Sequence, residues 1–180
     1  QIQAEDPQDS IFALGIVNFP EADIDGVEMW VSWLPNANWS IEATVGRNDG
    51  ELSQAQTLFA DTPGAIPVPV GTRLPIVPDV KRNLKVLYQV PRTIFGGEPY
   101  IMLRYTYTGE SVNSLAGIES SSFSSPVVQQ GSWRTFDIQA GVETDVWSAS
   151  LYVDNVTDEN GELFFNNRFA QQRLTVNQPR

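Results

Sequence analysis

The stretch that decides the fold is Trp147-Ser-Ala-Ser-Leu-Tyr-Val-Asp-Asn-Val-Thr-Asp-Glu-Asn-Gly-Glu162. It begins as a strict alternation, with Trp147, Ala149, Leu151 and Val153 on one face and Ser148, Ser150, Tyr152 and Asp154 on the other. It then breaks into an acidic turn at residues 154–159. A period of two places one face of a strand in an apolar medium and the other in a polar one. The apolar medium is either the core of a soluble protein or lipid, and the two imply different functions.

Composition excludes several classes of protein. The 180 residues include 22 acidic and 11 basic side chains, and the net charge of -11 argues against nucleic acid as a partner. The chain has no Cys, so disulfides and thiolate chemistry are excluded, and no His, which disfavours triad and metal-dependent hydrolysis. No apolar run approaches the roughly 18 residues of a transmembrane helix. Because Gln1 is not an initiator and no signal segment follows, we expect a processed N-terminus or a piece of a longer chain.

Alternation of the same kind recurs along the chain and predicts an all-β protein. Strands are expected at residues 24–34, 39–46, 80–90, 100–108, 133–143 and from 147 onward. An apolar run at residues 10–19 brings the total to about seven strands. A short helix is possible at residues 51–60, and residues 162–178 show only a weak pattern.

The connections between these strands alternate in length. Those at residues 35–38, 91–99 and 143–145 are short or modest, whereas those at residues 48–79 and 109–132 are long. Because successive antiparallel strands reverse direction, one end of the sheet carries tight turns and the other carries long loops. Outer-membrane barrels show this asymmetry, with short periplasmic turns and longer extracellular loops.

Charged and aromatic positions leave the choice between lipid and core open. The polar faces carry Glu28, Glu42, Lys85, Arg104, Asp137 and Glu143. Charges in mid-strand suit a water-filled lumen, and they also suit the wet face of a soluble sheet. Aromatic side chains mark both strand ends: Trp33, Trp39 and Trp147 near short turns, and Tyr105, Tyr107 and Trp133 near long loops. Such rings form interfacial girdles in a membrane barrel, but they are ordinary core residues in a soluble sandwich.

Four motifs follow one another in order along nearly the whole chain. They are Ile24-Asp-Gly-Val-Glu-Met-Trp-Val-Ser-Trp-Leu-Pro35, Gly71-Thr-Arg-Leu-Pro-Ile-Val-Pro78, Tyr105-Thr-Tyr-Thr-Gly-Glu-Ser111 and the segment from Trp147 to Glu159. These motifs resemble, in turn, a Gly-x-Glu strand ending in a turn proline, a Gly-x-x-Leu-Pro-x-x-Pro element, a late hairpin and a penultimate strand with its Asn-(Leu/Val)-Thr-Asp turn. Pro179-Arg180 resembles the pair that opens the final strand. Together they resemble the C-terminal β-barrel of a TonB-dependent outer-membrane receptor.

The resemblance implies that residues 1–180 are a C-terminal fragment of such a barrel in the bacterial outer membrane. It implies an antiparallel meander of about seven strands, part of a transmembrane β-barrel, with the final strand, the earlier strands and the plug outside this chain. Such a piece has two unpaired edges, so we expect an open, curved sheet.

The resemblance also implies a function for the intact protein. The receptor would bind and import a scarce nutrient, such as a ferric siderophore, a cobalamin or an oligosaccharide, with energy relayed by TonB. Its partners would be the lipid bilayer, the nutrient and, through missing N-terminal regions, TonB. It would not be an enzyme, and no cofactor or metal is implied.

Two other functions are compatible with the residues alone. A soluble β-sandwich could bind carbohydrate on exposed aromatic side chains. A glycosidase could use a pair from Glu28, Glu42 and Asp137, because these carboxylates sit on polar strand faces. In a barrel the same carboxylates would be charges of the lumen wall, with Arg104 and Lys85 as partners.

Candidate ligand and metal contacts are weakly specified. The acidic turn contains Asp154, Asp158, Glu159 and Glu162, but an EF-hand pattern laid on it would start at Val156 and end at Asn167, so it fails as a calcium loop. The long loops could contact a ligand, and Phe59, Arg73 and Phe123 are their candidate residues.

Overall fold

The described part of the chain is built from strands alone. The computed structural model describes every residue except 1, 6–13, 18–20, 59–65, 116–126 and 167–172. Its strands are β1 Ile2–Glu5, β2 Leu14–Val17, β3 Ala22–Asn36, β4 Trp39–Leu52, β5 Gln56–Leu58, β6 Ile66–Val68, β7 Val80–Gln89, β8 Glu98–Thr108, β9 Ser111–Val112, β10 Gln129–Gln130, β11 Trp133–Glu143, β12 Ser148–Val153, β13 Glu162–Asn166 and β14 Arg173–Val176. No helix among these residues is long and apolar enough to cross a membrane.

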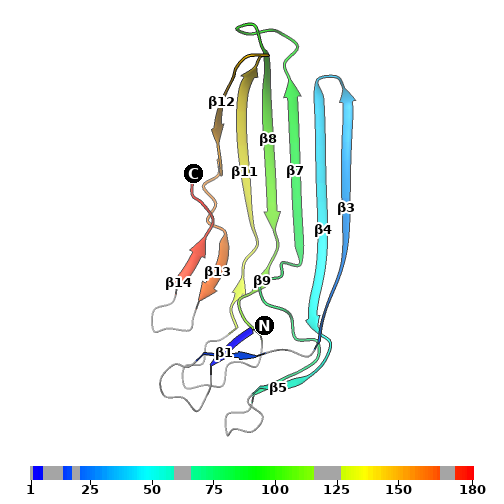
Figure 1. Ribbon diagram of the computed structural model, residues 1–180, viewed down its shortest axis with the longest axis vertical. Coiled ribbons are helices and arrows are strands. Elements are labelled where there is room, and N and C mark those ends of the chain that lie inside the picture. Colours follow the sequence, from blue (N-terminus) through cyan, green and yellow to red (C-terminus); the bar gives the residue numbers. More distant parts are fainter. Residues whose placement is uncertain (1, 6–13, 18–20, 59–65, 116–126, 167–172) are drawn as a thin grey trace.

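Six of these strands form one antiparallel sheet in the spatial order β12-β11-β8-β7-β4-β3 (Figure 1). Each strand pairs with its predecessor along the chain in this set, so the sheet is a meander, as the alternating segments predict. The remaining strands form separate two-stranded hairpins. The expected asymmetry of connections is present: the links from β3 to β4, β7 to β8 and β11 to β12 are short, whereas those from β4 to β7 and β8 to β11 are long.

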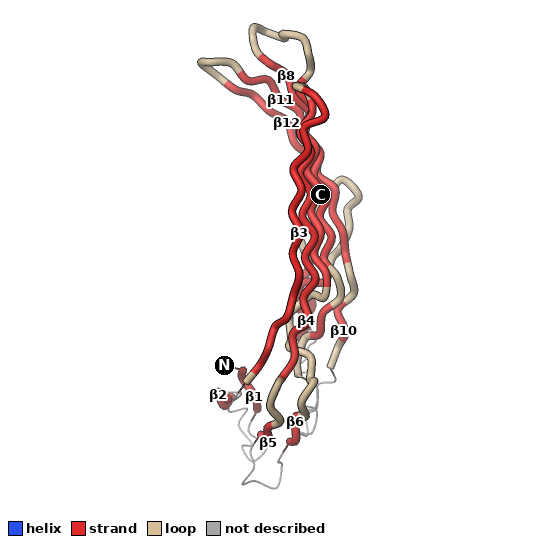
Figure 2. Tube along the Cα trace, turned by 90° about the vertical axis from the view of Figure 1, so that its right-hand side faces the viewer, coloured by secondary structure: helices blue, strands red, loops and turns tan. Residues whose placement is uncertain are grey.

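The main sheet is a single curved layer. Figure 2 shows it edge-on, with no second sheet packed against its length. The only buried hydrophobic side chains among the described residues are Leu52, Val68 and Leu115, and none of them lies in the middle of the sheet. A β-sandwich would bury an inner face on each of two sheets. The described residues therefore do not form the soluble sandwich considered above, and the expected open sheet is confirmed.

Three local expectations differ from the structure. The possible helix at residues 51–60 is wrong for its described part, because residues 51 and 52 end β4 and residues 56–58 form β5. Within the apolar run at residues 10–19, the described strand β2 pairs with β1 instead of joining the main sheet. The weakly patterned segment after residue 161 contains the hairpin of β13 and β14. In each case pairing with another strand overrides the local pattern.

One face of the sheet is apolar across all six strands. Following the cross-strand pairs gives an unbroken row of hydrophobic side chains, Trp33, Ile41, Val86, Leu103, Ile138 and Val153. We call this side the apolar face and the opposite side the polar face. Aromatic pairs lie toward both ends of the apolar face, with ring centroids 4.5 Å apart for Trp39 and Tyr88 and 4.8 Å apart for Tyr105 and Phe136.

The apolar band runs obliquely across the strands. Trp33 ends the apolar run of β3 toward the short turns, whereas Val153 ends the run of β12 toward the long loops, yet both lie in the same row. The band therefore shifts along the strands by about six residues, or roughly 20 Å, over five interstrand steps that total about 24 Å. A band level with a membrane then requires strands tilted by about 40°, which is the tilt of strands in closed barrels.

Leu151 and Ser150 test this assignment of faces. Leu151 lies in the middle of the apolar run of β12 and pairs with Ala140, whereas Ser150 pairs with Gly141 and faces the other way. Leu151→Arg in the intact barrel should lower the free energy of unfolding by about 2–4 kcal/mol, because it places a charge in mid-bilayer. Ser150→Arg serves as the matched control and should cost far less. Urea titration in lipid vesicles measures both, and equal costs would contradict the assignment.

Candidate functional site

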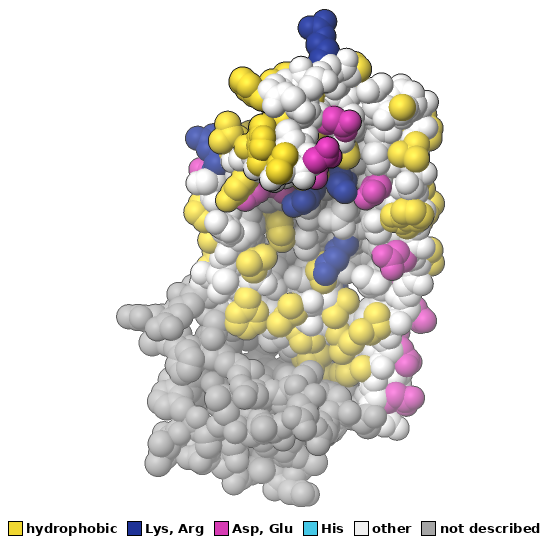
Figure 3. All heavy atoms as spheres, turned by 45° about the horizontal axis from the view of Figure 1, so that its top comes forward, with side chains coloured by type: hydrophobic (Ala, Val, Ile, Leu, Met, Phe, Trp, Pro, Cys, Tyr) yellow, Lys and Arg dark blue, Asp and Glu magenta, His cyan; other side chains and the backbone are white. Residues whose placement is uncertain are grey.

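The polar face carries a row of four charged side chains on four neighbouring strands. Cross-strand pairing aligns Glu42 on β4, Lys85 on β7, Arg104 on β8 and Asp137 on β11. Lys85 Nζ lies 3.7 Å from Glu42 Oε2, and Arg104 Nη1 lies 3.9 Å from Asp137 Oδ2. The expected pairing of the two cations with these carboxylates is therefore present, and Figure 3 shows basic and acidic side chains close together on the side of the molecule that it displays.

The row remains open to solvent. The Arg104 side chain is 50% exposed and that of Asp137 is 21% exposed. Ion pairs this exposed contribute little to stability, so the row is better suited to meeting a polar ligand than to holding the sheet together. A hollow of about 220 Å³ lies beside Arg104 and is lined by Met102, Arg104, Asp137, Ile138, Gln139, Tyr152 and Asp154. Beside it, Gln139 Nε2 donates a hydrogen bond to the Tyr100 hydroxyl (2.8 Å).

The three candidate carboxylates, Glu28, Glu42 and Asp137, are too far apart to act as a glycosidase pair. Glu42 and Asp137 are separated by three interstrand steps, which place their backbones about 14 Å apart. Glu28 pairs with Gly46, four residues along β4 from Glu42, so this separation is also about 14 Å. Retaining glycosidases need about 5.5 Å between carboxyl groups, and inverting enzymes need at most about 9.5 Å. The sheet brings none of the three proposed pairs together.

The motif at residues 71–78 folds over the polar face at the long-loop end. A Cβ on Gly50 of β4 would lie 3.4 Å from Leu74 and 3.5 Å from Val77, so both side chains cover the strand there. Backbone bonds fix the segment, because Leu74 N–H donates to Gly50 O (2.8 Å) and Gly71 N–H donates to Leu52 O (2.9 Å). Gly71 has φ of +80°, a conformation that disfavours side chains, which explains the glycine that begins the motif.

Arg73, a candidate ligand contact, joins two loops. Its Nη2 donates to the backbone carbonyl of Glu110 (2.6 Å), which follows β8, while Arg73 itself belongs to the connection from β4 to β7. An isolated antiparallel β-bridge between Glu51 and Arg73 also holds the backbone of Arg73 against the end of β4. Arg73 therefore positions the loops that lie above the polar face. The other two candidates, Phe59 and Phe123, lie outside the described residues.

The acidic turn after β12 is organised by Asn155, a residue that the sequence alone did not single out for this role. Its side chain is 3% exposed, and its φ is 48°. The amide accepts a hydrogen bond from Glu159 N–H (3.0 Å) and donates to the carbonyls of Glu159 (2.9 Å) and Gln178 (3.2 Å). The Asn155 N–H donates to Asp137 Oδ1 (2.9 Å), which joins the turn to the charged row. Asn tolerates positive φ and forms hydrogen bonds with nearby backbone groups. The presence of Asn in the turn motif was therefore the sequence signal that could have predicted this role of Asn155.

No metal centre forms in the described part of the chain. Its acidic side chains do not come together in a group of three or more that could hold an ion. The acidic turn containing Asp154, Asp158, Glu159 and Glu162 is held by backbone and amide hydrogen bonds, and Asp158 Oδ1 accepts one from Arg180 N–H (3.2 Å).

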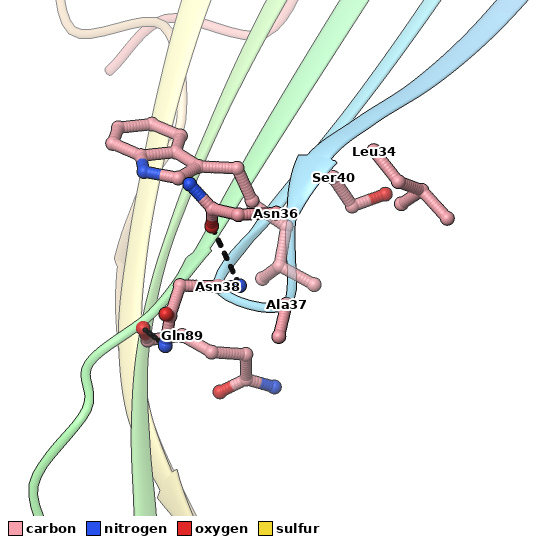
Figure 4. Close-up of a pocket in the computed structure, with 8 residues that line it drawn as sticks. Leu34, Asn36, Ala37, Asn38, Ser40 and Gln89 are labelled. Carbon is pink, nitrogen blue, oxygen red and sulfur yellow. Dashed lines mark hydrogen bonds between the residues drawn. The ribbon is translucent and has the colours of Figure 1, made fainter.

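A second hollow lies at the short turn between β3 and β4 (Figure 4). It is lined by Leu34, Asn36, Ala37, Asn38, Trp39, Ser40, Leu87 and Gln89, none of which is charged. Asn38 Nδ2 donates to Gln89 O (3.0 Å), and Asn36 Oδ1 accepts from Asn38 N–H (2.9 Å), so the amides hold the turn. Ser40 carries the one hydroxyl among these lining residues, and none of the others is a titratable group that could activate it.

Asn155→Ala should loosen the turn after β12. The substitution removes three amide hydrogen bonds and leaves a Cβ at positive φ, so we expect the local free energy of opening to fall by about 2–3 kcal/mol. Hydrogen exchange at the Glu159 amide in the intact barrel measures this loss. Asn155→Gly is the control: it keeps the backbone conformation accessible and should cost about 1 kcal/mol less. Unchanged exchange in the alanine variant would show that the amide bonds do not hold the turn.

Comparison with known proteins agrees with this geometry. The family model described as TonB dependent receptor-like, beta-barrel, matches residues 1–156. A comparison with curated proteins found no match. Among solved structures, the ferric yersiniabactin uptake receptor FyuA from Yersinia pestis has a similar fold, with a TM-score of 0.64 and 22% sequence identity. The match covers 87% of this chain and 22% of that receptor, so the chain spans about a fifth of its length. The chain thus belongs to the TonB-dependent receptor β-barrel family, whose members are receptors and transporters of the bacterial outer membrane.

Proposed function

We propose that residues 1–180 are a C-terminal portion of a receptor barrel that imports a scarce nutrient with energy relayed by TonB. In this proposal the apolar face meets lipid, and the polar face lines the lumen through which the nutrient passes. The observation that carries it is the separation of the two faces, with an apolar row across six strands and a charged row behind it. In this proposal the plug and the region that binds TonB belong to parts of the receptor outside residues 1–180.

A ferric siderophore is the nutrient class that we favour. The receptor with the similar fold takes up ferric yersiniabactin, and ferric chelates commonly present carboxylate or phenolate oxygens. Arg104 at the hollow on the polar face offers a guanidinium to such an anion, and Lys85 lies beside it on the next strand. Cobalamin and an oligosaccharide are the other two classes. The class can be identified by measuring uptake of a labelled ferric siderophore, cobalamin and oligosaccharide in cells that have this receptor as their only import route for each.

Removing the two cations of the charged row should impair uptake of a ferric siderophore. For Arg104→Gln combined with Lys85→Gln in the intact receptor, we expect initial uptake to fall about tenfold or more, because each charged hydrogen bond contributes roughly 1.5–3 kcal/mol. Arg92→Gln combined with Lys81→Gln removes the same charge from positions outside the row and is the matched control. Equal uptake by the two double variants would show that the charged row does not contribute to import.

The chain on its own should not behave as a soluble module. Strands β3 and β12 present unpaired edges, and the apolar face exposes side chains such as Leu151 (83%) and Val27 (76%). Such edges and patches drive association in water, so we expect residues 1–180 to aggregate without detergent. Size-exclusion chromatography with and without detergent measures this behaviour. A detergent-free monomer that unfolds cooperatively would contradict the assignment of the apolar face to lipid.

A further inference from the structure

Three arginines lie together on the apolar face of the sheet. Arg82 on β7 and Arg134 on β11 share one cross-strand row, with Tyr107 of β8 between them. The guanidinium carbon of Arg82 lies 5.2 Å from the centre of the Tyr107 ring, which restrains it by a cation–π contact. Arg47 lies on β4, two residues beyond Val45, the partner of Arg82. Among the basic residues on the six strands of the main sheet, these three lie on the apolar face. The other three, Lys81, Lys85 and Arg104, lie on the polar face.

The arginines sit where the apolar band ends toward the long loops. The row next to Arg82 and Arg134 consists of Phe136, Tyr105, Leu84, Ala43 and Val31, which are apolar or aromatic. Beyond Arg47, the next row of this face holds Asp25 opposite Asp49. The cations therefore mark the level at which hydrocarbon gives way to headgroups, and the long loops place this level on the extracellular side.

These guanidinium groups have no carboxylate partner in the described part of the chain. Both ion pairs found there, Lys85 with Glu42 and Arg104 with Asp137, lie on the polar face. Arg47, Arg82 and Arg134 are all exposed. In a protein with a net charge of -11, these exposed cations without a carboxylate partner are available to pair with an anion from outside the chain.

We propose that Arg47, Arg82 and Arg134 bind the phosphate groups of a lipid headgroup in the outer leaflet. A guanidinium forms paired hydrogen bonds with phosphate, and Arg is favoured over Lys for this geometry. The backbones of Arg82 and Arg134 are two interstrand steps, about 10 Å, apart, so their long side chains can converge on one headgroup or hold two neighbouring phosphates. The acyl chains of the same lipid then cover the apolar rows below the arginines.

The test measures binding of a phosphorylated lipid to the intact receptor. Detergent-purified receptor is titrated with lipid A carrying both phosphates, with dephosphorylated lipid A and with inorganic phosphate, and bound lipid is counted by native mass spectrometry. We expect phosphorylated lipid A to bind at least about tenfold more tightly than the dephosphorylated form, as charge-assisted hydrogen bonds require. Arg82→Gln combined with Arg134→Gln should abolish that preference, and Arg82→Lys with Arg134→Lys should retain part of it.

The matched control keeps the same charge change away from this face. Lys81→Gln combined with Arg92→Gln removes two cations, one on the opposite face of β7 and one in the β7–β8 connection, and should bind like the unaltered receptor. Heat-modifiable migration in electrophoresis verifies that each variant is a folded barrel, and single Arg134→Gln replaces the double variant if that one does not fold. Equal binding of both lipids, or an unchanged preference in the folded glutamine variant, would overturn the proposal. Complete competition by millimolar inorganic phosphate would overturn it too, since it would show a free-phosphate site.

Discussion

The rest of the structure depends on the pairing of backbone groups between strands. In hydrocarbon each N–H and C=O must find a partner within the protein, and antiparallel pairing along β3, β4, β7, β8, β11 and β12 provides it without a second layer. A sheet satisfied in this way needs no buried core of its own, which explains why three buried hydrophobic side chains suffice in the described residues. Its two outer strands keep unpaired edges, so this sheet is complete only as part of a larger barrel.

The same pairing determines how the band lies relative to the membrane. Because Trp33 and Val153 share a row but end their apolar runs at opposite ends, the strands must tilt to bring those runs to one level. The tilt of about 40° follows from register and sequence pattern together, and neither would give it alone. A soluble sheet has no reason to shift its apolar band by about one residue per strand. The oblique band is thus a physical signature of the bilayer that does not rest on resemblance.

The resemblance to a barrel implied the pairing of Lys85 and Arg104 with nearby carboxylates, and local periodicity predicted the main strands and the lengths of their connections. It could do so because each of these features follows from alternation within one strand or from neighbouring strands. It could not predict the roles of Asn155 or Arg73, which depend on Gln178 and Glu110, residues more than twenty positions away. The far end of β4 was missed for the same reason, since Leu52 extends the strand by pairing with Ala22.

The distribution of cations makes register a functional property as well as a structural one. Lys81 and Arg82 are adjacent in β7, yet they project to opposite faces, one toward the proposed lumen and the other toward lipid. Slipping β7 by one residue would move Lys85 out of the charged row, place it among the hydrophobic side chains of the apolar face and carry Arg82 into the lumen. A charge near the middle of the bilayer is costly, so the lipid that stabilises the apolar face also penalises this slip. Because the same alternation sorts cations for two environments, the register that suits the membrane also keeps Lys85 in the charged row without any contact to a ligand.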